Sequence, residues 1–143
     1  IDISSKSISL SNRNAKRLSI ENRVEFIKTD VDNFCIGKYD MVISNPPYIK
    51  TNEIKYLERD VNNFEPKLAL DGGLDGTLKT LKIIKKASTL LKVNGKLILE
   101  IGYNQKTIII GLLKTFTKGF MFLYPAFINL EPLPDIGIIT CTL

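Results

Sequence analysis

The sequence contains no histidine and no tryptophan, and its two cysteines, Cys35 and Cys141, stand far apart. Without histidine a histidine-based metal centre is excluded, and the cysteines lack the CxxC spacing of a zinc motif. No apolar run approaches the roughly 20 residues that a membrane helix needs. These absences favour a soluble protein of a reducing, cytoplasmic compartment, with no metal and no membrane partner.

What the sequence does contain suits a globular fold. With 44% hydrophobic residues among 143, the chain can bury a real core, so we expect residues 1–143 to form part of a single domain and to act as a monomer. The formal net charge is +5, but the lysines are scattered along the chain. We interpret them as solvated helix faces and expect no direct binding to nucleic acid.

Helical and strand patterns alternate along the chain. Ser4 can cap a first helix, Asn94-Gly95 should end a later one, and the apolar run Met41–Ile43 is typical of a fully buried parallel strand. The predicted helices cover residues 5–18, 78–91 and 105–116. The predicted strands cover residues 24–28, 39–44, 96–101, 120–128 and 138–143. A long polar loop, with one helical turn near residues 53–58, covers residues 49–76. This order predicts an α/β fold with a doubly wound, mostly parallel sheet.

Such sheets bind ligands beyond the carboxyl ends of their strands. The apolar-acidic dipeptide Ile1-Asp2 is interpreted as the end of a further strand. Three of the predicted strand ends therefore carry unusual residues: Asp2, Asp30 and the tetrapeptide Asn45-Pro46-Pro47-Tyr48. We therefore expect the functional site to be built from these three positions.

The tetrapeptide Asn45-Pro46-Pro47-Tyr48 suits methyl transfer to an amide or amino nitrogen. An amide nitrogen is a poor nucleophile, so an enzyme must hold both N–H bonds and align the nitrogen with the methyl donor. The Asn45 side-chain oxygen and the Pro46 carbonyl are two acceptors for that purpose, and the prolines stiffen the turn. Tyr48 offers a ring face to a planar amide or a sulfonium. The alternative is that Pro-Pro merely ends a strand and that Asn45 is an ordinary turn residue.

Further segments, in the right order, make the sequence resemble the release factor glutamine methyltransferase family, also called PrmC or HemK. The matching segments are Tyr39 to Ile49, Phe64-Glu65-Pro66, Ala69 to Gly73, Asp75-Gly76 and Glu100-Ile101-Gly102. Their spread over about half of the chain makes a chance match improbable.

The resemblance implies the class I S-adenosylmethionine-dependent methyltransferase fold, with a Rossmann-like sheet. It implies S-adenosylmethionine as donor, class 1 peptide chain release factors as protein substrates, and N5-methylation of the glutamine in their Gly-Gly-Gln motif. By the same resemblance, Asn45, Pro46 and Tyr48 are the catalytic residues, and Asn45, Pro46, Pro47 and Tyr48 bind the glutamine.

The resemblance also assigns residues to the donor. Asp2 matches the acid that holds the ribose hydroxyls, Val31 occupies the adenine-contact position, Asp30 faces the adenine amine, and Asn45 touches donor and substrate alike. Asp2 taken alone is equally a helix-leading acid next to Ser4. Val31 is smaller than the residues that can occur at its position in the family.

The remaining matches are interpreted as support. Glu65-Pro66 and the Ala69–Gly76 loop are expected to be scaffold, with glycines that allow close backbone approach and with Asp71 or Asp75 as a helix cap. Glu100 could satisfy buried donors beside the site or lie at the edge of the core, and it is not assigned to catalysis.

The sequence also departs from the family. The family places a first strand and a glycine-rich turn before its acidic strand, and the backbone N–H groups of that turn contact the donor's methionine carboxylate. Residues 1–143 do not include this segment or an amino-terminal helical domain, and the tail after Gly119 lacks the Asp, Gly and Arg pattern. We therefore expect a sheet that is incomplete at its N-terminal strand, and an isolated chain that is not an autonomous enzyme. Two alternatives stay open: an N6-adenine or other amino-group methyltransferase, and an inactive fragment of the family.

Overall fold

The computed structural model describes residues 1–117, 132–133 and 136–142, and it divides into two compact units, residues 1–36 and residues 37–143. In the first unit, helix α1 spans Ser5–Arg17. The Ser4 hydroxyl caps it by accepting a hydrogen bond from the Ser7 N–H at 3.2 Å. Beyond its last turn, Ser19 has a φ of 54°, a left-handed conformation common at helix ends. The helix predicted after Ser4 is confirmed.

The strand predicted over residues 24–28 is wrong. This segment of the first unit forms one isolated parallel bridge, Asp2 with Lys28, held by the Asp2 N–H on the Ile27 carbonyl at 3.2 Å and the Thr29 N–H on the Asp2 carbonyl at 3.0 Å. One bridge is too short a ladder to make a strand. The 3-10 helices of the unit are η1 (Glu21–Arg23) and η2 (Val31–Asn33).

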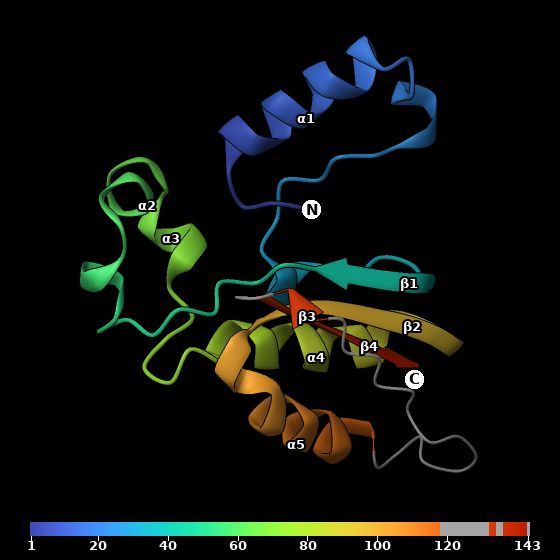
Figure 1. Ribbon diagram of the computed structural model, residues 1–143. Helices are drawn as coiled ribbons and strands as arrows, with labels where there is room; N and C mark the ends of the chain where they lie inside the picture. Colours follow the sequence, from blue (N-terminus) through green and yellow to red (C-terminus); the bar gives the residue numbers. More distant parts are fainter. Residues whose placement is uncertain (118–131, 134–135, 143) are drawn as a thin grey trace. The chain divides into compact units, whose positions relative to one another are not determined.

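The second unit contains a sheet of order β1-β2-β4-β3 (Figure 1). Its strands are β1 (Tyr39–Ser44), β2 (Leu91–Gly102), β3 (Pro132–Leu133) and β4 (Ile136–Thr142). β1 and β2 are parallel, while β4 pairs antiparallel with both β2 and β3, so the described sheet is mixed rather than mostly parallel. The strand predicted over 138–143 corresponds to β4, and the one predicted over 120–128 lies outside the described residues.

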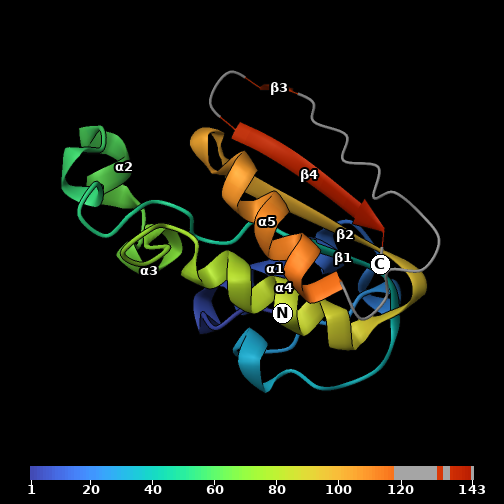
Figure 2. The same ribbon diagram turned by 90° about the horizontal axis from the view of Figure 1, so that it is seen from below.

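The predicted helices of the second unit are confirmed as α4 (Leu78–Leu90) and α5 (Lys106–Thr117). Both lie on the same face of the sheet (Figures 1 and 2). Alternate residues of β2 point into this layer, and Leu97 and Leu99 are 0% exposed. The core residues are Ile84, Ala87, Leu91, Leu97, Leu99, Ile101, Ile109 and Leu113. No helix in the described part of the chain is long and apolar enough to span a membrane.

Strand β1 is less buried than its sequence predicts. Val42 packs against the core, but Met41 is 43% and Ile43 is 69% exposed. The reason is geometric: alternate side chains of a strand point to opposite faces, and α4 and α5 cover one of them. The continuous apolar run therefore indicated the strand correctly and its burial wrongly.

Strand β2 begins earlier than predicted. Asn94 has a φ of 64°, and the pairing with β1 shifts between Tyr39–Leu91 and Met41–Lys96. Asn94-Gly95 thus produces an irregularity inside β2 instead of a loop before it.

The segment between β1 and α4 contains more helix than predicted. It holds η3 (Ile54–Tyr56), α2 (Arg59–Phe64) and α3 (Lys67–Leu70), while η4 (Tyr103–Gln105) follows β2. Only the turn near 53–58 was expected, because α2 and α3 are too short to show helical periodicity. In Figure 1, α2 and α3 lie beyond the carboxyl end of β1, where the candidate site is found.

Candidate active site

The tetrapeptide Asn45-Pro46-Pro47-Tyr48 follows β1 directly and lines a pocket of about 370 Å³. Asn45 is exposed, Pro46 is buried, and Pro47 and Tyr48 are half-buried. The other lining residues are Ile49, Glu65, Ala69 and Leu70. A pocket of this size suits a side chain or a small planar group.

Among the described residues that line the pocket, five are apolar and three are polar, and none carries a cationic side chain. Its polar side chains are those of Asn45, Tyr48 and Glu65, and Glu65 is the charged one. Such a lining favours a neutral polar group over an anion. Glu65 was expected to be scaffold, and its place in the pocket wall came from the fold of α2 and α3, which the sequence pattern did not reveal.

The loop from Ala69 to Gly76 holds the chain that leaves the tetrapeptide. The Ile49 N–H donates to the Leu70 carbonyl at 3.1 Å, and the Gly72 N–H donates to the Ile49 carbonyl at 2.8 Å. One step further along, the Thr51 N–H donates to the Gly73 carbonyl at 3.0 Å. These bonds act as a short parallel ladder between the two segments.

Gly72 makes this close approach possible. A Cβ on Gly72 would lie 2.8 Å from the Pro47 carbonyl oxygen and 2.6 Å from that of Gly76. Both neighbours are backbone atoms, which cannot rotate away. The scaffold role expected for this loop thus has a steric basis at the tetrapeptide itself.

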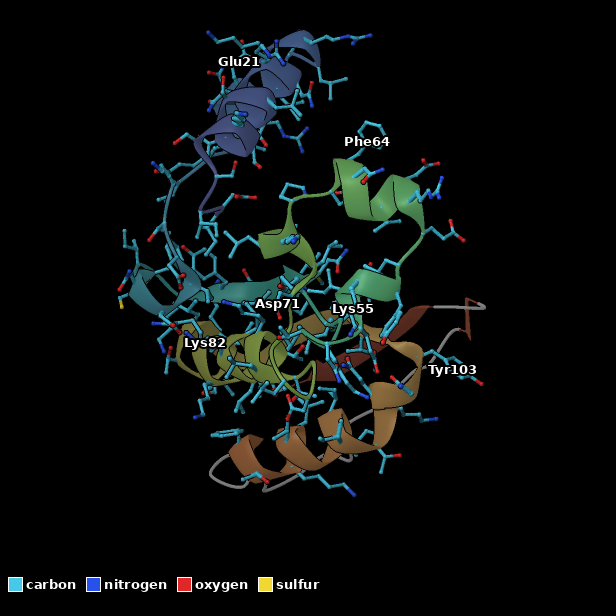
Figure 3. The ribbon with its side chains drawn as sticks, turned by 90° about the vertical axis from the view of Figure 1, so that its left-hand side faces the viewer. Glu21, Lys55, Phe64, Asp71, Lys82 and Tyr103 are labelled. Carbon is cyan, nitrogen blue, oxygen red and sulfur yellow. The ribbon has the colours of Figure 1, made fainter. Side chains whose placement is uncertain are left out.

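Asp71 and Asp75 fix the loop internally. The Asp71 carboxylate accepts from the Thr51 hydroxyl at 2.7 Å and from the Gly73 N–H at 2.9 Å, and these bonds hold the pKa of Asp71 below its ordinary value. Asp75 accepts from the Thr77 N–H at 2.9 Å, which likewise lowers its pKa. Figure 3 labels Asp71 within this loop, before α4.

Tyr48 contacts Glu100 on β2. The Tyr48 hydroxyl donates to Glu100 Oε1 at 3.3 Å. Burial raises the pKa of the Tyr48 phenol, and the charge and hydrogen bond of Glu100 raise it further. The phenol therefore stays protonated as a donor, and Glu100 satisfies a part-buried donor beside the pocket, one of the roles foreseen for it.

Gln105, in η4, was not singled out from the sequence. It is 6% exposed, and its Nε2 donates to the Tyr48 carbonyl at 2.9 Å and to the Gly76 carbonyl at 3.1 Å. Its Oε1 accepts from the Gly102 N–H at 3.2 Å. A lone glutamine at a helix start gives no sequence signal for such a role, because the contacts come from distant segments.

The donor residues suggested by the sequence, Asp2, Asp30 and Val31, lie in the first unit. The bridge between Asp2 and Lys28 sets Asp2 beside the segment that leads to Asp30. Asp2 Oδ1 accepts from the Ser4 N–H at 2.7 Å, and Asp30 Oδ1 accepts from the Asp32 N–H at 2.9 Å.

Each of these two carboxylates thus accepts a backbone hydrogen bond through one of its oxygens. Carboxylate oxygens can accept hydrogen bonds from hydroxyl and amine donors such as those of a nucleoside.

Comparison with known proteins identifies the family of this chain. A sequence model of the family described as "Methyltransferase small domain" matches residues 1–75. The release factor glutamine methyltransferase of Agrobacterium fabrum is 36% identical over 105 residues, which are 73% of this chain and 36% of that protein. The ribosomal protein uL3 glutamine methyltransferase of Francisella tularensis is 37% identical over 106 residues, 73% of this chain and 33% of that protein.

The solved structures agree on the fold. An O-methyltransferase family protein of Burkholderia thailandensis aligns over 99% of this chain and 42% of its own, with a TM-score of 0.60 and 12% identity. The class I methyltransferase fold expected from the sequence is therefore confirmed. The chain spans about a third of the length of the two glutamine methyltransferases, at 36% and 33%.

Proposed function

We propose that this chain, which belongs to the methyltransferase small-domain family, is the carboxyl-terminal part of a single catalytic domain that methylates the side-chain amide nitrogen of glutamine in a protein. The resemblance to the glutamine methyltransferases is confirmed by relatives that are 36% and 37% identical. The observation that carries the proposal is the pocket lined by Asn45, Pro46, Pro47 and Tyr48, because it combines acceptors with an apolar wall.

Asn45 and Pro46 hold the nitrogen. The Asn45 side-chain oxygen and the Pro46 carbonyl each accept one N–H of the glutamine amide, so the nitrogen lone pair faces the methyl group. Proline fixes the backbone at both positions after Asn45, and the acceptors therefore need little reorganisation when the substrate enters.

Tyr48 and Pro47 hold the rest of the substrate glutamine side chain. The Tyr48 ring stacks on the planar amide, and its hydroxyl is directed to Glu100 instead of the substrate. Pro47 closes the apolar wall. The proton that the nitrogen loses after methylation passes to water, since the pocket opens to solvent at the exposed Asn45.

S-adenosylmethionine, when bound, supplies an electrophilic methyl group on a sulfonium. In this chain Asp2 would accept hydrogen bonds from the ribose hydroxyls, and Asp30 would accept one from the adenine amine. Val31 would contact the adenine ring. Asn45 would contact both the donor and the glutamine. The bridge that sets Asp2 beside the segment leading to Asp30 supports this assignment.

The favoured substrates are class 1 peptide chain release factors, methylated at the glutamine of Gly-Gly-Gln in the cytoplasm. A glutamine of ribosomal protein uL3 is the second candidate, because a relative with that name is as similar to this chain as the release factor enzyme is, at 37% and 36% identity.

The substrate is tested by incubating the full-length protein with labelled S-adenosylmethionine and, separately, a release factor, ribosomal protein uL3 or DNA. We expect label in the release factor. Label in uL3 alone would assign the second candidate, and label in DNA would overturn glutamine methylation in favour of an amino-group methyltransferase.

A further inference from the structure

We propose that Gln105 is a positioning residue that fixes the Asn45–Tyr48 turn for methyl transfer. The proposal rests on the function proposed above and adds a residue to that site. Gln105 does not touch the pocket, so it acts through the backbone of Tyr48.

The Gln105 carboxamide is fully used by three backbone groups. Both hydrogens of Nε2 are committed, one to the Tyr48 carbonyl and one to the Gly76 carbonyl, and Oε1 takes the Gly102 N–H. These groups belong to the tetrapeptide, to the loop of residues 69–76 (the scaffold loop) and to the end of β2. One side chain therefore locks together three segments that are distant in sequence.

Two glycines leave room for this amide. A Cβ on Gly76 would lie 2.6 Å from Gln105 Nε2 and 2.5 Å from the Tyr48 carbonyl oxygen. A Cβ on Gly102 would lie 3.3 Å from the Gln105 carboxamide and 3.3 Å from the Tyr48 ring. The space for Gln105 therefore depends on the missing side chain at Gly76, while a side chain at Gly102 would only crowd the carboxamide.

The position of the amide distinguishes it from an ordinary buried polar residue. Thr80 is also buried, yet its hydroxyl has no hydrogen-bond partner among the described residues. Gln105 instead holds the Tyr48 peptide group, two residues after the Pro46 carbonyl that would accept the substrate N–H. Releasing the Tyr48 carbonyl lets this acceptor shift, and a misplacement of about 1 Å can cost on the order of 100-fold in rate.

The test compares two variants of the full-length protein with a control. Gln105→Met keeps the volume and removes all three bonds, while Gln105→Glu keeps the acceptor for Gly102 and removes both donors. The control Ile109→Val shortens a core residue of α5 that is 0% exposed and has no role in the pocket.

We expect both Gln105 variants to lower kcat, by up to about 100-fold, with an unchanged Kd for S-adenosylmethionine. Ile109→Val should keep kcat at a temperature where all the proteins are folded. Gln105 variants with the same kcat as the Ile109→Val control would overturn the proposal. Failure of both Gln105 variants to fold, beside a folded control, would also overturn it, because Gln105 would then be a stability residue.

A second readout does not depend on activity. Titration of the Tyr48 phenol, followed by nuclear magnetic resonance of labelled tyrosine, should show its raised pKa moving toward the ordinary value in Gln105→Met and staying raised in Ile109→Val. Burial and Glu100 raise this pKa, so it falls only if the loss of the Gln105 bonds lets the phenol leave its place beside Glu100. An unchanged Tyr48 pKa in Gln105→Met would show that Gln105 does not hold Tyr48 in place. A wild-type protein that methylates no glutamine would refute the proposed function, while this titration still decides the role of Gln105.

Discussion

The ring and the hydroxyl of Tyr48 have separate tasks. Tyr48 lines the pocket, and its hydroxyl donates to Glu100 on β2 at 3.3 Å. A bond of this length to a part-buried carboxylate contributes modestly, and the apolar ring face is what a glutamine amide would meet.

Replacing Tyr48 can separate these tasks. We expect Tyr48→Phe to keep kcat within about tenfold, a change of about 1.4 kcal/mol, since the ring remains. We expect Tyr48→Ala to lower kcat far more, because this change removes the aromatic ring that would stack on the amide. Steady-state kinetics with a Gly-Gly-Gln peptide measure both, and an equal loss in the two variants would show that the hydroxyl, not the ring, is needed.

Thr80 offers a stability prediction outside the pocket. It is 0% exposed in α4, and its hydroxyl has no hydrogen-bond partner in the described part of the chain. Thr80→Val keeps the shape and removes an unsatisfied polar atom, so we expect the free energy of unfolding to rise by about 1 kcal/mol. Denaturant unfolding followed by circular dichroism measures this, and a loss of stability would mean that the hydroxyl has a partner in solution.

At the scale of elements, the scaffold loop and the tetrapeptide form one clamped unit. Gly72→Ala would push a methyl group against the Pro47 and Gly76 carbonyls, at 2.8 and 2.6 Å. We expect a loss of about 1 to 3 kcal/mol in stability and a lower kcat, because the turn must move.

The control is Gly111→Ala in α5, where a Cβ would meet nothing within 4 Å. That variant should gain about 0.4 to 1 kcal/mol and keep its activity. Thermal unfolding and methylation assays on both proteins decide the matter. A Gly72→Ala protein as stable and active as wild type would show that the loop is not held as closely as described.

The loop should also loosen in acid. The hydrogen bonds from Thr51 and Gly73 lower the folded-state pKa of Asp71 below its unfolded value. Its stabilising effect is therefore complete above the unfolded pKa, near about 4, and is lost as the pH falls through the lower folded pKa.

Asp71→Asn removes this dependence, since an amide oxygen can still accept from both partners but does not titrate. The difference in Tm between wild type and Asp71→Asn should shrink as the pH falls from 7 to below about 4. A difference that stays constant or grows would contradict the assigned cause of the pKa shift.

The elements also show what the sequence could and could not predict. Periodicity located α4 and α5 because each has an apolar face with a clear repeat, and a continuous apolar run located β1. It failed for residues 24–28, where alternation exists but one bridge is made, and for α2, which is too short to show a period. A local sequence pattern indicates which secondary structure a segment prefers, but not whether another strand pairs with it.

The candidate site likewise has residues that the sequence could predict and residues that it could not. The tetrapeptide was recognisable because its residue types answer a chemical need, and it does line a pocket. Gln105 and Glu65 were not assigned to the site, because their places depend on how η4 and α2 meet segments far away in the sequence. Contacts of that kind leave no local pattern.

At the scale of the whole molecule, the two units carry different proposed tasks. Residues 1–36 contain Asp2, Asp30 and Val31 for the donor, and residues 37–143 contain the pocket for the acceptor. The family match over residues 1–75 includes parts of both. The residues proposed for the donor and those that line the pocket therefore all lie within the segment that the family model matches.

The identity of the methylated atom tests the central claim most directly. The full-length protein, as wild type and as Asn45→Ala, is incubated with a release factor and labelled S-adenosylmethionine, and the product is fragmented in a mass spectrometer. We predict the methyl group on the side-chain nitrogen of the Gly-Gly-Gln glutamine in wild type, and a loss on the order of 100-fold in Asn45→Ala. A methyl group on any other atom, or an Asn45→Ala protein as fast as wild type, would contradict the claim that this pocket holds a glutamine amide.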